Sequence, residues 1–93
     1  MIYVKFHEGV VAICDCDLIG KTFADGKTEI KVSEYFYKGE ERNNGDVREI
    51  MLENDNLNIL GKESVRVAID AGIVEEEDVI FIKGVPHAQA ISL

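Results

Sequence analysis

The chain lacks the long apolar segment that a membrane helix requires. No apolar run approaches the roughly 18 consecutive residues needed to span a bilayer, although 46% of the 93 residues are hydrophobic. The first residues, MIYVKFHEGVVAIC, alternate in polarity, whereas a signal peptide has a basic stretch followed by an unbroken apolar one. We expect a cytoplasmic protein with one domain over residues 1–93, because this length is too short for two independent cores.

Cysteine is scarce, with only Cys14 and Cys16. Alternate residues of a strand lie about 6.6 Å apart, which is poor geometry for a disulfide. Their one-residue spacing is shorter than zinc motifs use, and His7 is expected about 13 Å from Cys14 along a hairpin. No recognisable nucleophile turn surrounds either thiol, so a catalytic cysteine activated by histidine is disfavoured. The sequence therefore predicts no metal site and no cofactor.

A glycine is missing where a phosphate-binding P-loop would need one. Gly20-Lys21-Thr22 matches the end of that motif, but the position five residues before Gly20 is Asp15. The full motif requires glycine there, and a carboxylate in its place would repel phosphate. A P-loop nucleotide site is therefore excluded.

Positive charge is also in short supply. The chain carries 18 acidic and 10 basic residues, a net charge of −8. Residues 40–93 account for −7 of this, with twelve acids against five bases, and residues 1–39 for −1. Broad binding of duplex nucleic acid needs a cationic surplus and is excluded. A local basic strip stays possible, although lysines can equally solubilise a loop and an edge strand; its members would be Lys21, Lys27, Lys31 and Lys38.

The N-terminal region predicts a β-hairpin. Residues 2–7 and 10–16 alternate in polarity around a tight turn at Glu8-Gly9, and a consistent register should collect their apolar side chains on one face. The predicted register pairs Phe6 with Val11, Val4 with Ile13 and Ile2 with Asp15.

Further strands and two main helices follow. Asp46 and Glu49 have capping-box spacing and predict a helix that starts at Asp46, preceded by a loop over residues 41–45. A second helix is predicted from about Lys62 to Ala71. Strands are expected over residues 28–32, 56–60, 79–83 (buried) and 87–93. The predicted fold class is α+β, a small mixed or antiparallel sheet with an N-terminal hairpin and two main helices packed on it.

The segment GVPHAQ holds the only proline, Pro86, next to one of the two histidines. Gly84 and Pro86 are expected to form a rigid corner before the last strand. His87 and Gln89 would then share one face of that strand and offer hydrogen-bond donors and acceptors. The alternative is a purely structural corner in which His87 bonds to a backbone carbonyl.

The segment SEYFYKG concentrates three of the seven aromatic residues. Ser33 is a suitable N-cap and Gly39 a suitable stop for one or two helical turns. Three consecutive aromatics on a helical turn cannot all point inward, so Tyr35 or Tyr37 beside Lys38 is a candidate contact surface. Core anchoring is the alternative use of these rings.

Three segments together resemble a known family. YVKFHEGVVAICDCDLIGKTF, VSEYFYKGE and GVPHAQ are similar to an archaeal family of uncharacterised proteins, domain of unknown function 424, over residues 2–92. The resemblance implies an archaeal cytoplasmic protein and an association with translation or RNA handling. It assigns no catalytic residue, and the two cysteines lie outside its pattern.

Three hypotheses about function follow. The first is a non-enzymatic adaptor for a protein or ribonucleoprotein of the translation machinery, where an acidic second half suits a basic partner. Its contact surface would combine Lys21, Lys31, Tyr35, Tyr37, Lys38, His87 and Gln89. The second is a small enzyme with His87 as general acid/base, beside Glu8 or Glu34, in a pocket closed by residues 35–37. The third is a homodimer that pairs through a C-terminal edge strand.

Overall fold

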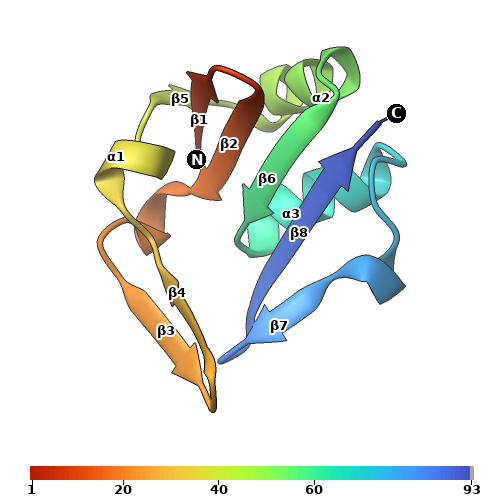
Figure 1. The fold of residues 1–93 in the computed structure, drawn as a ribbon. Coiled ribbons are helices and arrows are strands. Elements are labelled where there is room, and N and C mark those ends of the chain that lie inside the picture. The colour runs from red at the N-terminus through yellow and green to blue at the C-terminus, as the bar shows by residue number, and fades with distance from the viewer. Residues whose placement is uncertain (93) are drawn as a thin grey trace.

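A mixed six-stranded sheet with two helices on one face forms the body of the protein. The computed structural model describes residues 1–92, so the last residue of the strand predicted over 87–93 lies outside the described residues. The sheet order is β5-β1-β2-β6-β8-β7, and β3 and β4 form a separate hairpin (Figure 1). Only β2 and β6 pair in parallel. This confirms the predicted α+β fold class.

The main-sheet strands are β1 (Ile2–His7), β2 (Val10–Asp15), β5 (Glu40–Arg42), β6 (Asn56–Leu60), β7 (Ile80–Ile82) and β8 (Val85–Ile91). The small hairpin consists of β3 (Thr22–Asp25) and β4 (Thr28–Lys31). The helices are α1 (Glu34–Tyr37), α2 (Asn44–Glu53) and α3 (Lys62–Asp70), with single 3₁₀ turns at Cys16–Leu18 and Glu76–Asp78. No helix within residues 1–92 is both long enough and apolar enough to cross a membrane.

The N-terminal hairpin has the predicted register. Ile2 lies opposite Asp15, Val4 opposite Ile13, and Phe6 opposite Val11. Ile2 and Val4 are buried, but Phe6 is 57% exposed. Since β5 flanks β1 only from Ile2 to Val4, the far end of β1 is paired with β2 on one side and, among residues 1–92, has no strand on the other. The apolar face of the hairpin is therefore buried only in part.

Two predictions for residues 41–45 were wrong. Residues 40–42 form the edge strand β5, which pairs with β1, where a loop was expected. Helix α2 begins at Asn44, because the side chain of Asn43 caps it and accepts a hydrogen bond of 2.8 Å from the backbone N–H of Asp46. An asparagine is as good an N-cap as aspartate, so residue type alone does not favour Asp46 over Asn43.

The C-terminal corner is a tight hairpin. Lys83 and Gly84 both have positive φ, 52° and 78°, the pattern of a two-residue type I′ turn. Pro86 lies inside β8, opposite Phe81, and not at a corner. It is tolerated there because β6 pairs with β8 only from His87 onward. The turn, and not the proline, therefore reverses the chain.

Strand β7 is an exposed edge and not the buried strand predicted from its apolar composition. Ile80 and Phe81 are 60% and 62% exposed. Strand β7 pairs with β8 only from Val85 to His87, so the rest of β8 has β6 on one side and no strand of the described residues on the other. The pairing of two chains through this C-terminal edge stays a prediction. The edges of the main sheet are β5 and β7.

The main hydrophobic core lies between the sheet and helices α2 and α3. Ile13, Leu57 and Ile59 of the central strands pack against Val47 and Met51 of α2. Helix α3 adds Val65, Val67 and Ala68 to the same cluster. Ala12, Cys14 and Leu60, which point the other way, belong to a second, smaller cluster with residues of α1 and the β3–β4 hairpin.

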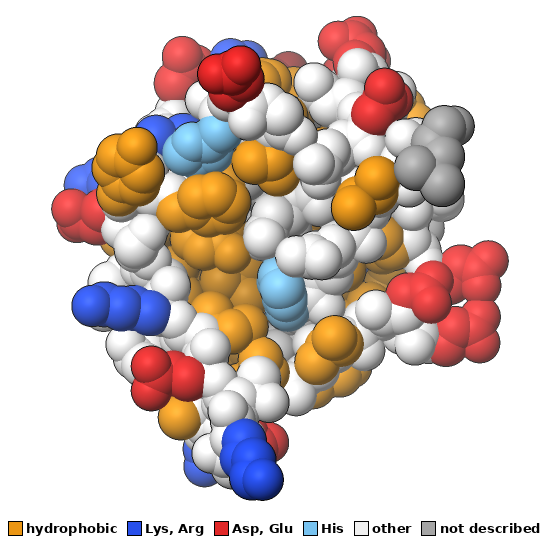
Figure 2. Space-filling view, in the orientation of Figure 1, with side chains coloured by type: hydrophobic (Ala, Val, Ile, Leu, Met, Phe, Trp, Pro, Cys, Tyr) orange, Lys and Arg blue, Asp and Glu red, His pale blue; other side chains and the backbone are white. Residues whose placement is uncertain are grey.

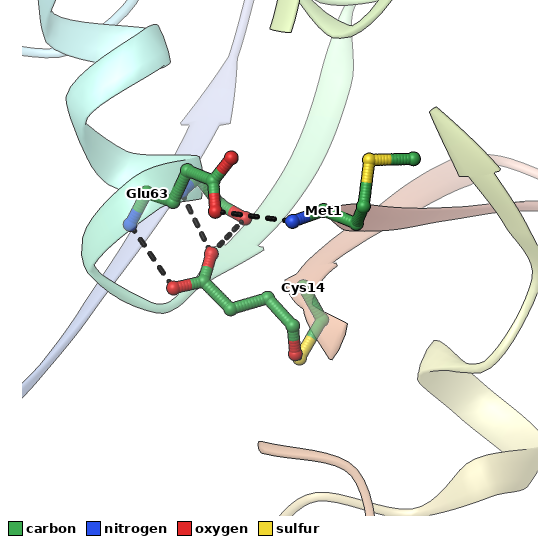
Figure 3. Close-up of polar contacts among 5 residues, drawn as sticks. Met1, Cys14 and Glu63 are labelled. Atoms are coloured by element: carbon green, nitrogen blue, oxygen red, sulfur yellow. Dashed lines mark hydrogen bonds and ion pairs between the residues drawn. The ribbon is translucent and has the colours of Figure 1, made fainter. Parts of the chain in front are cut away.

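Helix α3 is capped by a carboxylate from another element. Its own N-cap, Gly61, has no side chain, and the carboxylate of Asp15 at the end of β2 takes that role. The carboxylate accepts hydrogen bonds from the backbone N–H groups of Glu63 (3.0 Å) and Ser64 (2.8 Å) and from the Ser64 hydroxyl (2.6 Å) (Figure 3). A negative group at a helix N-terminus is also attracted by the positive end of the helix dipole, which stabilises the helix. Asp15 therefore fixes the start of α3 to the end of β2.

Gly61 makes this contact sterically possible. Its φ is +111°, and a Cβ at this position would lie 2.3 Å from Cγ of Asp15, well inside van der Waals contact. Its backbone N–H donates a 2.9 Å hydrogen bond to the carbonyl of Pro86. The same residue therefore links β6, β8 and the first turn of α3.

We expect Asp15→Ala to destabilise the protein by about 3 kcal/mol, because two amide donors and a hydroxyl lose a charged acceptor. For a domain of this size the loss corresponds to a fall in melting temperature of roughly 10–20 °C. Gly61→Ala should destabilise through the clash with the same carboxylate. The matched control is Asp17→Ala, an exposed acid two residues on, which should change stability by less than about 0.5 kcal/mol. Equal melting temperatures for the Asp15 and Asp17 variants would contradict the cap.

Candidate functional site

The face of the sheet opposite α2 and α3 is covered only in part. Helix α1 packs over its β1–β2 side, and the β3–β4 hairpin contacts β7 and packs Phe23 and Ile30 against the cluster beneath α1. In Figure 2 the two histidine side chains lie on either side of a recessed hydrophobic area of this face. We name the surface around them the histidine face. It comprises Lys5, His7, Tyr35, Phe36, Tyr37, Asn58, His87 and Gln89.

The strand register places its sheet residues on one side. His87 lies opposite Leu60 of β6 and Ile80 of β7, and Gln89 lies opposite Asn58. Directly paired residues share a face, and so do alternate residues of a strand. His87 and Gln89 therefore point to the same side, as predicted, and Ala88 is buried against the helices.

Helix α1 provides the covering aromatic residues. Ser33 caps it as predicted, and its hydroxyl accepts a 3.1 Å hydrogen bond from the backbone N–H of Phe36. The ring of Tyr37 is buried and packs edge-on to Phe36 with 4.8 Å between centroids. The Tyr37 hydroxyl donates a 2.8 Å hydrogen bond to Oδ1 of Asn58. Burial raises the pKa of Tyr37 to about 12, so the hydroxyl is protonated and acts as a donor.

His87 shares that asparagine. Its Nε2 lies 3.2 Å from Oδ1 of Asn58, so Nε2–H donates to an oxygen that also receives the Tyr37 hydroxyl. Half-burial lowers the pKa of His87 below its ordinary 6.5, which favours the neutral imidazole. The structural alternative, a bond from His87 to a backbone carbonyl, is not what the structure shows. Residues from α1, β6 and β8 meet in one polar network.

The other side of α1 presents an exposed ring that is held in place. His7 stacks on Phe36, with 4.7 Å between centroids and 12° between planes, and its Nε2 lies 2.8 Å from the Phe36 carbonyl oxygen. Lys5 donates a hydrogen bond to the Tyr35 carbonyl, and its Nζ lies 5.0 Å from the centroid of the Tyr35 ring. Tyr35 is nevertheless 82% exposed. A large aromatic side chain is thus both accessible and ordered.

The predicted site residues do not form one surface. Tyr35, Tyr37, His87 and Gln89 belong to the histidine face, and Lys38 is the exposed C-cap of α1. A different part of the surface, a cleft of about 660 Å³, is lined by Lys21, Gly84 and Pro86. Lys31 is exposed at the end of β4, opposite Thr22. The single contact surface predicted from the sequence is therefore divided.

Three residues of the histidine face were missed. Asn58 was included in a predicted strand without a role, and Lys5 and His7 of the predicted hairpin were not assigned to the contact surface. The sequence did contain a signal for Asn58, since the segment NLNIL has asparagine at the alternate positions 56 and 58. An amide on a central strand needs a hydrogen-bond partner, so a polar contact could have been expected there.

The enzyme hypothesis requires a carboxylate beside His87. Among residues 1–92, the only side-chain hydrogen bond of His87 goes to Asn58, and the predicted partners Glu8 and Glu34 are exposed elsewhere. The buried thiol of Cys14 has a pKa raised to about 12 by burial, so it is not a thiolate at neutral pH. Within the described part of the chain no three His, Cys, Asp or Glu side chains are grouped closely enough to hold a metal ion.

The fold and this face define a small α+β protein with a sheet packed on one side and half open on the other. The chain belongs to the family described as protein of unknown function DUF424, whose model matches residues 5–93. It is similar to the crystal structure of an uncharacterized conserved protein from Methanopyrus kandleri, with 28% identity and a TM-score of 0.72 over 96% of this chain and 87% of that chain. A search of curated proteins gave no match. The family resemblance predicted from the sequence is confirmed, and neither the family description nor the similar structure assigns an activity.

The lowered pKa of His87 determines the direction in which folding stability changes with pH. Since the folded-state pKa lies below 6.5, the unfolded chain binds the proton more readily, and stability is lost as pH falls through 6.5 toward the folded-state value. We expect His87→Gln to remove this part of the pH dependence. NMR titration of the imidazole Cε1 proton should give a midpoint below 6.5 for His87. A midpoint at or above 6.5 would show that the imidazole is not desolvated as described.

Proposed function

We propose that this chain is a non-enzymatic binding module that contacts a protein partner through the histidine face. The proposal rests on the exposure of Tyr35, which is 82% accessible although Lys5 contacts it. Lys5 bonds its carbonyl and lies over its ring. A preorganised aromatic side chain loses little conformational freedom on binding. Tyrosines of this kind are frequent among the few residues that dominate interface energetics.

The open half of the sheet extends the proposed contact. Ile80 and Ile91 are 60% and 64% exposed. Ile80 lies opposite His87, and Ile91 is four residues from His87 along β8, so both share its face. Exposed apolar side chains around neutral hydrogen-bonding groups are typical of the central part of a protein interface. This composition favours a protein partner over nucleic acid.

The charge of the chain favours a basic partner. The net charge is −8, of which residues 40–93 contribute −7. Opposite charge accelerates encounter between partners. A basic protein of a ribonucleoprotein, such as a ribosomal protein, fits this requirement. The association with translation rests on the family resemblance, and the archaeal source of the similar crystal structure suggests an archaeal extract as the first place to search.

Affinity isolation with matched variants tests the proposal. We expect Tyr35→Ala to lower affinity for the partner about thirtyfold, the loss of one dominant interface residue, with no change in melting temperature. The control is Phe81→Ala, an aromatic residue of similar exposure at 62% whose side chain points to the helix side. Parallel isolation with RNase shows whether RNA carries the contact.

The proposal is wrong if Tyr35→Ala recovers its partners as well as the parent chain does. It is also wrong if the Phe81 variant loses them while the Tyr35 variant keeps them. Loss of all partners on RNase treatment would show that RNA carries the contact. This result would contradict the proposal of a protein partner.

A further inference from the structure

We infer that a second site, separate from the histidine face, binds the phosphate group of an organic phosphate monoester. It is a cleft of about 660 Å³ between the start of the chain, the Cys16–Leu18 turn, β3, the first turn of α3 and the β7–β8 turn. None of its lining residues belongs to the histidine face. We name it the lysine cleft, after Lys21, Lys62 and Lys83.

Three lysines from separate elements converge on the cleft. Lys21 precedes β3, Lys62 is the first residue of α3, and Lys83 lies in the β7–β8 turn. They are three of the seven lysines in a chain whose net charge is −8. Among residues 1–92, no ion pair within 4.0 Å involves any of the three. Their charges are therefore available to an anion.

The carboxylates of the cleft are largely engaged. Asp15, the carboxylate that argues against a P-loop, accepts three hydrogen bonds from the start of α3. Both of its oxygens are bonded to the helix, so its charge is held against the N-terminus of α3. Glu63 pairs with the N-terminal amino group at 3.4 Å (Figure 3). Asp17 is the remaining acid of the lining. The three lysines and the N-terminal amino group exceed the three carboxylates of the lining by one formal charge. The cleft is therefore weakly cationic, and its three lysine ammonium groups suit a phosphate group.

An apolar wall stands beside these charges. Leu18, Phe23, Val85 and Pro86 line the same cleft. Pro86 is buried, and the other three are half-buried. A site for inorganic phosphate would need no such wall, whereas charged groups next to apolar and aromatic side chains are typical of sites for small organic ligands. The ligand class is therefore a phosphate joined to an apolar or aromatic group.

The conformation of Lys83 supports a role for its charge. Its φ of 52° is the only positive value at a non-glycine residue among the described residues. The first position of a type I′ turn favours asparagine, aspartate or glycine, and a long side chain at positive φ reduces stability. An asparagine would suit the turn better and would remove the charge. Lys83→Asn should therefore stabilise the fold and at the same time weaken ligand binding.

An NMR titration with phenyl phosphate tests the inference. In ¹H–¹⁵N spectra at constant ionic strength, we expect saturable shifts of the amides of Lys21, Lys62 and Gly84, and tighter binding than for inorganic phosphate. Lys83→Asn should raise the melting temperature yet weaken binding about tenfold, the effect of one charge-assisted contact. The control is Lys27→Asn, at an exposed lysine in the β3–β4 turn outside the cleft, which should leave affinity unchanged.

Four outcomes would overturn the inference. These are the absence of saturable shifts at the cleft, equal losses for the Lys83 and Lys27 variants, equal shifts with phenol alone, and equal affinity for inorganic phosphate and phenyl phosphate. The first three exclude a phosphate site, and the fourth excludes an organic phosphate as its ligand. Tyr35→Ala should not alter this titration, so the result is independent of the proposed protein contact.

Discussion

The carboxylate of Asp15 connects the two halves of this fold. Residues 2–15 form a hairpin by local pairing, whereas Glu63 and Ser64 of α3, which donate to Asp15, lie 48 and 49 positions further along the chain. The carboxylate satisfies donors that α3 would otherwise leave unpaired in a buried position. Gly61 is the residue that allows the approach, since any side chain would meet the carboxylate. With α3 fixed in this way, helices α2 and α3 cover one side of the sheet, and the other side stays half open.

The histidine face has hydrogen-bonded side chains beside an exposed aromatic ring. The Tyr37–Asn58–His87 network satisfies polar groups from three elements, and His7 and Lys5 hold α1 from the neighbouring strand. These contacts fix the backbone under Tyr35 and leave its ring open to solvent. The same sheet presents Ile80 and Ile91 on its uncovered half. The arrangement suits the proposed contact, and among residues 1–92 His87 hydrogen-bonds to Asn58 and to no carboxylate.

Features that depend on neighbouring residues could be predicted from the sequence, and features that depend on distant ones could not. The register of β1 and β2 follows from a turn and an alternating pattern, and Ser33 caps α1 through a residue three positions away. Apolar composition could not show that β7 is an exposed edge, because it does not specify strand order. The meeting of Asn58 with Tyr37 and His87 joins residues 21 and 29 positions apart. The lysine cleft likewise gathers three separate elements, which no local pattern predicts.

Photo-crosslinking from position 35 tests the central claim, that the histidine face is the contact surface, most directly. A photoreactive phenylalanine analogue would replace Tyr35 in one chain and Leu52 in another. Leu52 is an exposed apolar residue of α2, 55% accessible, outside the histidine face. In a native archaeal extract the account predicts a discrete protein adduct from position 35 that Tyr35-containing parent protein competes away, and none from position 52. An adduct from position 52 without one from position 35 would contradict it.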